Sequence, residues 1–380
     1  MIKRFEVRNY RNFFDSLVLD LSKTSGYQFN QDCINNNIIS KGIIYGKNAV
    51  GKTNLGNAIC DIRNTLVGKS ENNNVLNADS FEKYAYFRYD FRINEEDIIY
   101  EYTKSSNDSL LMEKLIVNEL TIYELDYSSR RFTTIDLEAI EADSIQADKF
   151  LMSLDNNEIE AEEDITVFPF LRFLFNNFAL PYNSTLRNLE RFILGIRVFN
   201  AKSRFPIGLR ATLKRSDYLS KGNHLSELQT FLNKAGVECE LELEELPDGS
   251  KELYFVHNNK ISVFDSASSG TQSLMNMYFR LIQGISMRSF IYYDEFDAFY
   301  HYELSEYIVK YLKDNMPNTQ ILFTTHNTNL MNNQLMRPDC LYILSSKGRI
   351  LPLCDATERE LREGHNLEKL YIAGEFNKYE

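Results

Sequence analysis

Residues 46–53, with the sequence GKNAVGKT, have the composition and spacing of a loop that binds a chain of phosphates. Glycines in such a GxxxxGK[ST] loop let backbone N–H groups turn inward toward phosphate oxygens, and the helix that follows adds partial positive charge. Lys52 can reach the outer phosphates, and the hydroxyl of Thr53 is a hard ligand suited to Mg²⁺. The residues that we assign to this phosphate loop are Gly46, Lys47, Asn48, Ala49, Val50, Gly51, Lys52, Thr53 and Asn54.

A second segment, FIYYDE at residues 290–295, is an apolar run that ends in two acids. The last residues of strands in open α/β sheets lie at the sheet edge where ligands bind. We therefore expect Asp294 to hold Mg²⁺, mostly through water, and Glu295 to polarise an attacking water molecule. Strands often end in acids, so this interpretation depends on the combination with residues 46–53.

Two shorter polar segments could also face a phosphate group. Residues 268–272, SSGTQ, precede a helical pattern and present Ser269, Gly270 and Gln272 at a helix N-terminus, which is a common anion site. Residues 321–326, ILFTTH, are an apolar run whose last residue, His326, could hydrogen-bond a terminal phosphate. Read alone, the first segment is an ordinary helix cap and the second ends in a structural histidine.

Alternating and periodic patterns indicate the elements that carry these segments. Apolar residues alternate along residues 2–21 as in a β-hairpin, and along 81–135 as in antiparallel strands with one wet face. A short apolar strand precedes the phosphate loop, and a helical pattern follows it as far as Gly68. From residue 274 onward, helices and apolar strands alternate as in a parallel sheet with crossover helices.

These patterns predict an α/β protein in three parts. Residues 1–135 form an N-terminal lobe with the phosphate loop and an antiparallel β subdomain, and residues 136–236 form a helical insertion. Residues 237–380 form a C-terminal lobe, which opens with strands around a Pro-Asp-Gly turn and carries the other three segments. We expect residues 355–380 to close the sheet rather than to dock a partner.

The charge and cysteine content of the sequence indicate in which compartment the protein works and which partners it can bind. The chain has 380 residues, a net charge of −12 and five cysteines, which are scattered and form no CxxC pair. This cysteine pattern indicates reduced thiols, and neither a signal peptide nor an apolar membrane helix is visible, so we expect a cytoplasmic protein without membrane contact. A negative surface repels nucleic acid on average, so DNA contact would need a local basic patch such as residues 187–221. Residues 136–164 are strongly acidic, and we interpret both charged runs first as solvated helix faces and alternatively as a contact surface for a partner.

In this order and combination, the four segments resemble the ABC-type ATPase heads of SMC, RecF and OLD-like proteins. GKNAVGKT is similar to Walker A, SSGTQ to the signature motif LSGGQ, IYYDE to Walker B with its catalytic glutamate, and TTH to the H-loop histidine. The opening FEVRNYRNF resembles the first strand and loop of RecF- and SMC-type heads, and Asp297 falls where the D-loop would be. Thr271 departs from the second glycine of the signature motif, and no acidic constellation after the H-loop suggests a built-in nuclease.

The resemblance implies an ABC-type P-loop ATPase head: a mixed central sheet with flanking helices, an antiparallel β subdomain and a helical insertion. It implies ATP and Mg²⁺ as ligands, with Lys52, Glu295 and His326 as catalytic residues and with Thr53 and Asp294 at the metal. In this family the signature motif of one subunit covers the ATP held by another. The resemblance therefore implies a homodimer or a higher even-numbered assembly.

The chain resembles small bacterial ATPases of phage-defence systems, such as the AbiL, Septu, PARIS and retron types, in its compact size and in three segments. These segments are DEFDAFYH, TTHNTNLM and RELREGHNLEKLYIAGEF. The favoured interpretation is an ATPase that regulates a separate effector, a nuclease or toxin from the same operon. A RecF-like DNA repair ATPase that binds DNA through residues 187–221 is an alternative. A third interpretation is an ATP-dependent scaffold without turnover, which the intact pair of Asp294 and Glu295 argues against.

Overall fold

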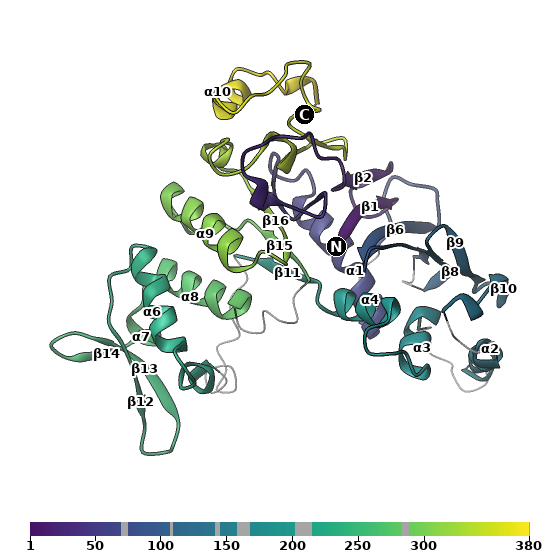
Figure 1. Cartoon of the computed structure of the whole chain (residues 1–380), viewed down its shortest axis with the longest axis horizontal. Helices are drawn as coiled ribbons and strands as arrows, with labels where there is room; N and C mark the ends of the chain where they lie inside the picture. The colour runs from purple at the N-terminus through teal and green to yellow at the C-terminus, as the bar shows by residue number, and fades with distance from the viewer. Residues whose placement is uncertain are drawn as a thin grey trace. The chain divides into compact units, whose positions relative to one another are not determined.

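The computed structural model describes residues 1–69, 75–106, 109–140, 145–157, 168–201, 215–282 and 289–379. The chain divides into two units that alternate along the sequence (Figure 1). Unit 1 comprises Met1–Val198, Met287–Asp294 and Pro317–Glu380, and unit 2 comprises Phe199–Ser286 and Glu295–Met316. None of the described helices is both long and apolar enough to span a membrane.

The central sheet has six strands in the order β11-β15-β16-β5-β17-β18. β15, β16, β5 and β17 are parallel, and β18 is antiparallel to β17. Every residue of β5, β15, β16 and β17 is buried, as expected of strands that are covered on both faces. The strands are β5 (Lys41–Tyr45), β11 (Arg197–Asn200), β15 (Phe290–Asp294), β16 (Gln320–Thr325), β17 (Leu341–Leu344) and β18 (Ile350–Pro352).

A second sheet of unit 1 has seven antiparallel strands in the order β10-β9-β8-β7-β6-β1-β2. Burial alternates residue by residue along β6, which confirms the predicted antiparallel strands with one buried face. The buried side chain of Gln320 joins the two sheets, because it bonds the backbone N–H and carbonyl of Ile2 at 2.9 Å each. The strands are β1 (Ile2–Arg8), β2 (Leu17–Asp20), β6 (Tyr84–Ile93), β7 (Glu96–Ser105), β8 (Leu110–Val117), β9 (Leu120–Asp126) and β10 (Arg131–Ile135).

The helices of unit 1 include one directly after the phosphate loop, as predicted. This helix, α1 (Lys52–Val67), ends at Gly68, whose left-handed φ of 70° is the usual conformation of a helix-ending glycine. The others are α2 (Ile145–Asn157), α3 (Phe170–Asn177), α4 (Thr185–Leu194) and α10 (Leu367–Ile372). A small ladder and several 3₁₀ turns complete this unit: β3 (Ile34–Asn35), β4 (Ile38–Ile39), Gln31–Cys33, Glu138–Ile140, Thr328–Leu330, Pro338–Cys340 and Asn377–Tyr379.

The described part of unit 2 contains a three-stranded antiparallel sheet and several helices. The predicted hairpin around the Pro-Asp-Gly turn is confirmed, since Leu241 pairs with Phe255 across it. Aromatic side chains of three helices form the core, where Phe231 lies 5.3 Å from Tyr278 and 4.9 Å from Tyr311 between ring centroids. The elements are α6 (His224–Lys234), β12 (Leu241–Glu245), β13 (Lys251–Val256), β14 (Lys260–Ser262), α7 (Val263–Ser266), α8 (Ser269–Ile282) and α9 (Tyr302–Asn315).

Two expectations differ from the structure. Residues 197–200, which lie within the predicted helical insertion of residues 136–236, form strand β11 at the edge of the central sheet. Residues 355–380 were expected to close this sheet, but β17 and β18 form its other end, and the described residues 355–379 add no strand. They contain α10 instead, which packs on the 3₁₀ turn Thr328–Leu330. The Asn333 amide holds this segment by donating to the carbonyls of residues 362, 363 and 365.

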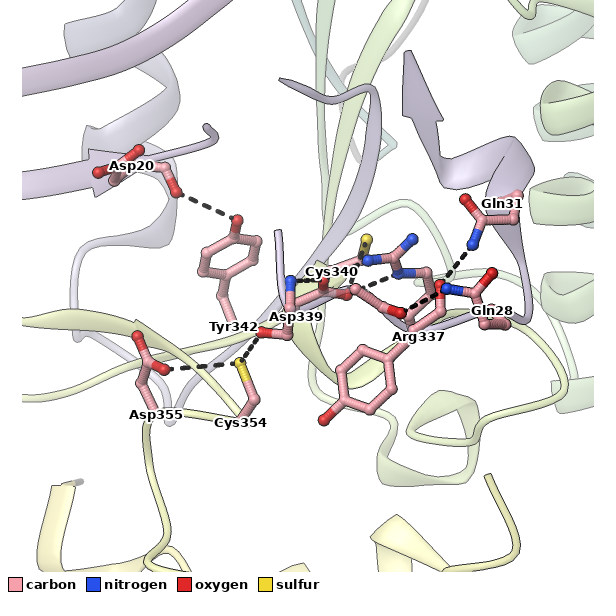
Figure 2. Close-up of polar contacts among 12 residues, drawn as sticks. Asp20, Gln28, Gln31, Arg337, Asp339, Cys340, Tyr342, Cys354 and Asp355 are labelled. Atoms are coloured by element: carbon pink, nitrogen blue, oxygen red, sulfur yellow. Dashed lines mark hydrogen bonds and ion pairs between the residues drawn. The ribbon is translucent and has the colours of Figure 1, made fainter. Parts of the chain in front are cut away.

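A buried ion pair lies just before β17, and a backbone N–H from the N-terminal part of the chain donates to its carboxylate (Figure 2). The guanidinium of Arg337 donates to both carboxylate oxygens of Asp339, at 2.9 and 2.6 Å, and the backbone N–H of Ser25 donates to the same carboxylate. Nearby, burial raises the pKa of Cys354 to about 11, so its thiol stays protonated at neutral pH. The five cysteines form no disulfide among the described residues.

Candidate functional site

The predicted phosphate loop lies between a buried strand and a helix, as its sequence requires. β5 ends at Tyr45, and α1 begins at Lys52, so residues 46–51 turn the chain from one into the other. Gly51 caps the helix with a φ of 105°, which side chains rarely tolerate. A Cβ atom on Gly46 would lie 2.8 Å from the carbonyl oxygen of Leu344. Both glycines are therefore needed for this path of the backbone.

Lys52 lies at the opening of the loop. Its ammonium donates to the carbonyl oxygens of Gly46 at 2.7 Å and Lys47 at 3.0 Å. The Nδ1 atom of His326 lies 3.5 Å from the same ammonium, at the end of β16. The structure thus brings the predicted lysine and histidine together, although 274 residues separate them in the sequence.

Asp294 joins the end of β15 to the start of α1. Its Oδ2 accepts a hydrogen bond from the Thr53 hydroxyl at 2.7 Å, and its Oδ1 accepts one from the Thr324 hydroxyl at 2.7 Å. The contact follows from the register, because Tyr293 pairs with Phe323 in parallel strands, and Asp294 and Thr324 come next. Sequence reasoning assigned no role to Thr324, although it lies in the TTH segment.

A hydroxyl and a carboxylate at this separation are hard oxygen ligands of the kind that Mg²⁺ prefers, so Thr53 and Asp294 fit the ion. Within the described parts of the chain, no group of three or more His, Cys, Asp or Glu residues could hold a metal ion. A magnesium ion here would therefore take most of its remaining ligands from phosphate oxygens and water, as is usual for this ion.

Tyr292 fixes the first turn of α1 against β15. Its hydroxyl donates to the carbonyl oxygen of Lys52 at 2.6 Å, and its ring faces Gly56 so closely that a Cβ there would lie 2.4 Å from Cδ1. Burial, and then the charge of Asp294, raise the pKa of Tyr292 well above its ordinary value. The phenol therefore stays protonated and remains a donor to the helix that carries Lys52 and Thr53.

The turn between β1 and β2 contacts the phosphate loop through side-chain hydrogen bonds. This contact was not predicted from the sequence. The Asn12 side chain donates to the carbonyl of Val50 at 3.0 Å and accepts from the Asn54 amide at 2.6 Å. Arg11 donates to the Asn54 side chain at 3.2 Å, with its backbone in the left-handed region at a φ of 49°. Residues 9–12, NYRN, interrupt the apolar alternation of the opening hairpin and are the sequence signal for this contact.

Glu295 and the signature-like segment belong to unit 2. Glu295 begins the turn after β15 with a φ of 47°, and its carbonyl oxygen accepts from the N–H of Ala298 at 3.0 Å. Left-handed backbone at a residue other than glycine, asparagine or aspartate is uncommon, and such strain gathers at functional sites. The predicted catalytic carboxylate therefore lies on a constrained turn.

The signature-like segment forms the start of α8. Ser268 caps the helix, because its hydroxyl oxygen accepts from the backbone N–H of Thr271 at 3.2 Å. Ser269 and Gln272 are exposed, and the atom nearest to a Cβ placed on Gly270 is a carbonyl oxygen 3.8 Å away. The predicted residues thus fall into two groups, with the loop, Asp294 and His326 in unit 1 and with Glu295, Ser269, Gly270 and Gln272 in unit 2.

Comparison with protein families gives a match over residues 43–332, from β5 past the end of β16. The family is described as "AAA domain, putative AbiEii toxin, Type IV TA system". The chain belongs to this AAA-domain family. The match includes both groups of site residues in this AAA domain, and the predicted ATP-binding fold is confirmed at this level. No curated protein matches the chain.

Several solved structures of SMC heads are similar to the chain at low sequence identity. The SMC head domain from Thermotoga maritima has a TM-score of 0.46 and 15% identity, covering 92% of this chain and 98% of that one. An Smc head bound to the C-winged helix domain of ScpA has a TM-score of 0.48 and 14% identity, with coverage of 93% and 98%. An Smc head with an extended coiled coil, bound to the C-terminal domain of ScpA derived from Pyrococcus furiosus, has a TM-score of 0.48 and 13% identity, with coverage of 93% and 97%.

Proposed function

We propose that this protein binds ATP together with Mg²⁺ on residues 46–54 and hydrolyses it to ADP and phosphate. The observation that carries the proposal is the hydrogen-bonded set of Thr53, Asp294 and Thr324 beside the opening of the phosphate loop. Such a set places a hydroxyl and a carboxylate where a triphosphate-bound metal would need them. Membership of an AAA-domain family supports the same ligand.

Each side chain has a distinct task in this proposal. The Lys52 ammonium, now bonded to loop carbonyls, would turn to the outer phosphate oxygens, and His326 would donate to the same phosphate. Glu295 would accept a proton from the attacking water, which it can orient from its constrained turn. A bound Mg²⁺ would supply positive charge that stabilises the transition state of phosphoryl transfer. Asp294 and Thr53 would hold that charge in place.

We also propose that two copies of the chain meet head to tail around ATP. The start of α8 supports this, because its N-terminal residues, the exposed Ser269 and the half-buried Gly270, can offer donors to a phosphate. Binding of ATP would then stabilise the dimer, and hydrolysis would release it, as in any association that a ligand favours. The family description names a toxin and a toxin–antitoxin system, which supports regulation of a separate effector protein from the same operon. A role in bacterial antiphage defence is part of this proposal.

Two variants test the ATPase and the dimer together. Lys52→Ala should abolish ATP binding, whereas Lys23→Ala removes an exposed lysine distant in sequence from the loop and should bind as the wild type does. Glu295→Gln should retain binding, slow hydrolysis by orders of magnitude and accumulate an ATP-bound dimer visible by light scattering. Tight binding by Lys52→Ala, or wild-type turnover by Glu295→Gln, would contradict the assignment.

The effector requires a separate experiment. Purification of the tagged protein from its native operon, with and without ATP, should co-elute one neighbouring gene product in a nucleotide-dependent manner. An ATPase that elutes alone under both conditions would refute the regulatory part of the proposal while leaving the ATPase intact. Wild-type protein that binds ATP and dimerises but never turns it over would instead be an ATP-dependent scaffold.

A further inference from the structure

Two arginines of unit 1 meet at the C-terminal end of α4. The Nε atom of Arg63, on α1, donates to the carbonyl oxygen of Leu194 at 3.3 Å. An Nη1 atom of Arg197 donates to the same oxygen and to the carbonyl of Ile196 at 2.8 Å. Because they share one acceptor, the two guanidinium groups lie side by side.

No described carboxylate balances this pair. Burial, and then the positive charge of Arg63, lower the pKa of Arg197, the Cys60 thiol acts in the opposite direction, and no carboxylate is among the causes of the shift. Neither arginine forms an ion pair within the described ranges, whereas Arg187 on α4 is paired with Glu190. Two like charges held together without an acid are stabilised by any anion that binds between them.

The contacts of Arg63 and Arg197 with the end of α4 do not use all of their N–H donors. Arginines commonly bond the last carbonyls of a helix, which accounts for the contacts with Leu194 and Ile196. Each guanidinium has five N–H donors in a planar fork. The hydrogen bonds described above use only a few of them, and Arg63 and Arg197 are only half-buried, so the remaining donors can reach a ligand from solvent.

The pair is separate from the phosphate loop. Arg63 follows Thr53 by ten residues on one helix, which places them about 15 Å apart along its axis. Ser289 is the residue directly before β15, and its hydroxyl donates to the carbonyl oxygen of Phe192 in α4. The C-terminal end of α4 therefore lies at the amino edge of the central sheet. The phosphate loop lies at the carboxyl edge, where β5 ends.

An aromatic side chain and a third arginine extend the feature along α4. The guanidinium of Arg191 lies 3.9 Å from the ring centroid of Tyr182, whose side chain is 76% exposed. Arg191 and Leu194 are neighbours on one helix face because they are three positions apart. Exposed aromatic rings beside arginines are surfaces on which nucleic-acid bases stack.

We infer that Arg63 and Arg197 bind a backbone phosphate of nucleic acid at the amino edge of the central sheet, with Arg191 and Tyr182 alongside. Guanidinium forks match the oxygens of a phosphate in a bidentate manner, and phosphate contacts supply most of the affinity for nucleic acid. This local cluster provides the positive charge that a chain of net charge −12 lacks on average. The inference does not depend on the proposed ATPase activity.

Binding of fluorescently labelled single-stranded DNA, duplex DNA and single-stranded RNA to the full chain, measured by anisotropy without nucleotide, tests the inference. The wild type should bind at least one of the three, and Arg63→Gln/Arg197→Gln should weaken that binding roughly tenfold or more at about 0.1 M salt. The slope of log affinity against log salt should fall by about one, since one phosphate contact is lost. Arg359→Gln, which removes an exposed arginine of the C-terminal segment, should stay within about twofold of the wild type.

Circular dichroism and thermal unfolding check that the double variant is folded. If it is not, Arg63→Lys and Arg197→Lys keep the charge but lose the fork, and each should weaken binding a few-fold. Wild-type affinity in the folded double variant, or no binding of any nucleic acid by the wild type, would overturn the inference. If polyglutamate binds the wild type as tightly as nucleic acid does, and the variants lose as much affinity for it, Arg63 and Arg197 would instead be assigned to binding an acidic protein partner.

Discussion

The carboxylate of Asp294 accepts a 2.7 Å hydrogen bond from the hydroxyl of Thr53, a residue 241 positions earlier in the chain. The bond joins the end of β15 to the first turn of α1, and a further bond from Thr324 fixes the second carboxylate oxygen. Both oxygens of Asp294 are therefore oriented before any ligand arrives. Such preorganisation lowers the cost of binding a metal in the required geometry.

Removal of the Thr53 hydroxyl should uncouple nucleotide binding from magnesium. Thr53→Ala deletes one oxygen ligand and leaves Asp294 without one of its donors, so we expect the gain in ATP affinity on adding Mg²⁺ to fall at least about tenfold. Isothermal titration with ATP, in Mg²⁺ and in chelator, measures this gain. Thr53→Ser should retain it, as should Thr65→Ala, which removes a hydroxyl later on the same helix. Unchanged magnesium dependence in Thr53→Ala would exclude this residue as a ligand.

Loss of the Asn12 side chain should loosen the phosphate loop. Asn12→Ala removes one hydrogen bond to the Val50 carbonyl and one from Asn54, and each is worth about 0.5–1.5 kcal/mol. We expect ATP affinity to fall by roughly tenfold, measured with a fluorescent analogue. Asn118→Ala, which also removes two side-chain hydrogen bonds but in the β8–β9 turn of the same unit, should leave affinity unchanged. Equal affinities for both variants would show that the loop keeps its shape without Asn12.

Local sequence patterns predicted the parts of the site that depend on neighbouring residues. The phosphate loop, the helix after it and the two apolar strands that end at Asp294 and Thr325 all have their expected places. A Gly-rich turn between a strand and a helix, or an apolar run ending in acids, is specified by the residues within it. The family match over residues 43–332 confirms the predicted class of fold.

Contacts between distant segments were not predictable from the sequence. Asn12 reaches Val50 because the β1–β2 turn packs on the loop, and Thr324 reaches Asp294 because two strands share a register. Residues 197–200 fell within the predicted helical insertion, yet pairing at the sheet edge makes them a strand. Tertiary packing decides such contacts and overrides the preferences of short segments.

The close approach of Gly56 to Tyr292 should make this glycine intolerant of a side chain. A Cβ atom would lie 2.4 Å from the buried ring, so Gly56→Ala should push Tyr292 away from Lys52 and destabilise the fold by about 1–3 kcal/mol. Urea denaturation measures the loss. Gly364→Ala is the matched control, since no atom lies within 4 Å of a Cβ at that position. A stable Gly56→Ala variant would mean that the ring can shift without cost.

Glu113 should be a major contributor to the stability of unit 1. This buried carboxylate accepts from three tyrosine hydroxyls and from the first two backbone N–H groups of α3. Glu113→Gln replaces an acceptor oxygen with a donor that faces other donors, so we expect a loss of about 2–4 kcal/mol in urea denaturation. Glu124→Gln breaks only the partly exposed ion pair with Lys114, so it should cost less than about 1 kcal/mol. Similar losses for the two variants would argue against a special role for the buried carboxylate.

The tyrosines around Glu113 and Asp61 should make the protein unstable in alkali. Burial first, and then nearby carboxylates, raise the pKa of these phenols well above the ordinary value of 10. Their contribution to stability is fully present below about pH 10 and is lost as the pH rises further, because the unfolded chain then releases protons that the folded chain keeps. The residues are Tyr89, Tyr100, Tyr102, Tyr123 and Tyr127.

Each tyrosine that stays protonated only in the folded chain should lower the free energy of unfolding with a slope that rises from about 0.7 kcal/mol per pH unit at pH 10 to about 1.2 at pH 11. Urea denaturation at a series of pH values gives this slope, and tyrosinate absorbance from the buried phenols should rise together with loss of structure. Tyr100→Phe should make the slope shallower by one proton per molecule. Constant stability up to about pH 11, or buried tyrosinate formed in a chain that remains folded, would contradict the burial of these phenols.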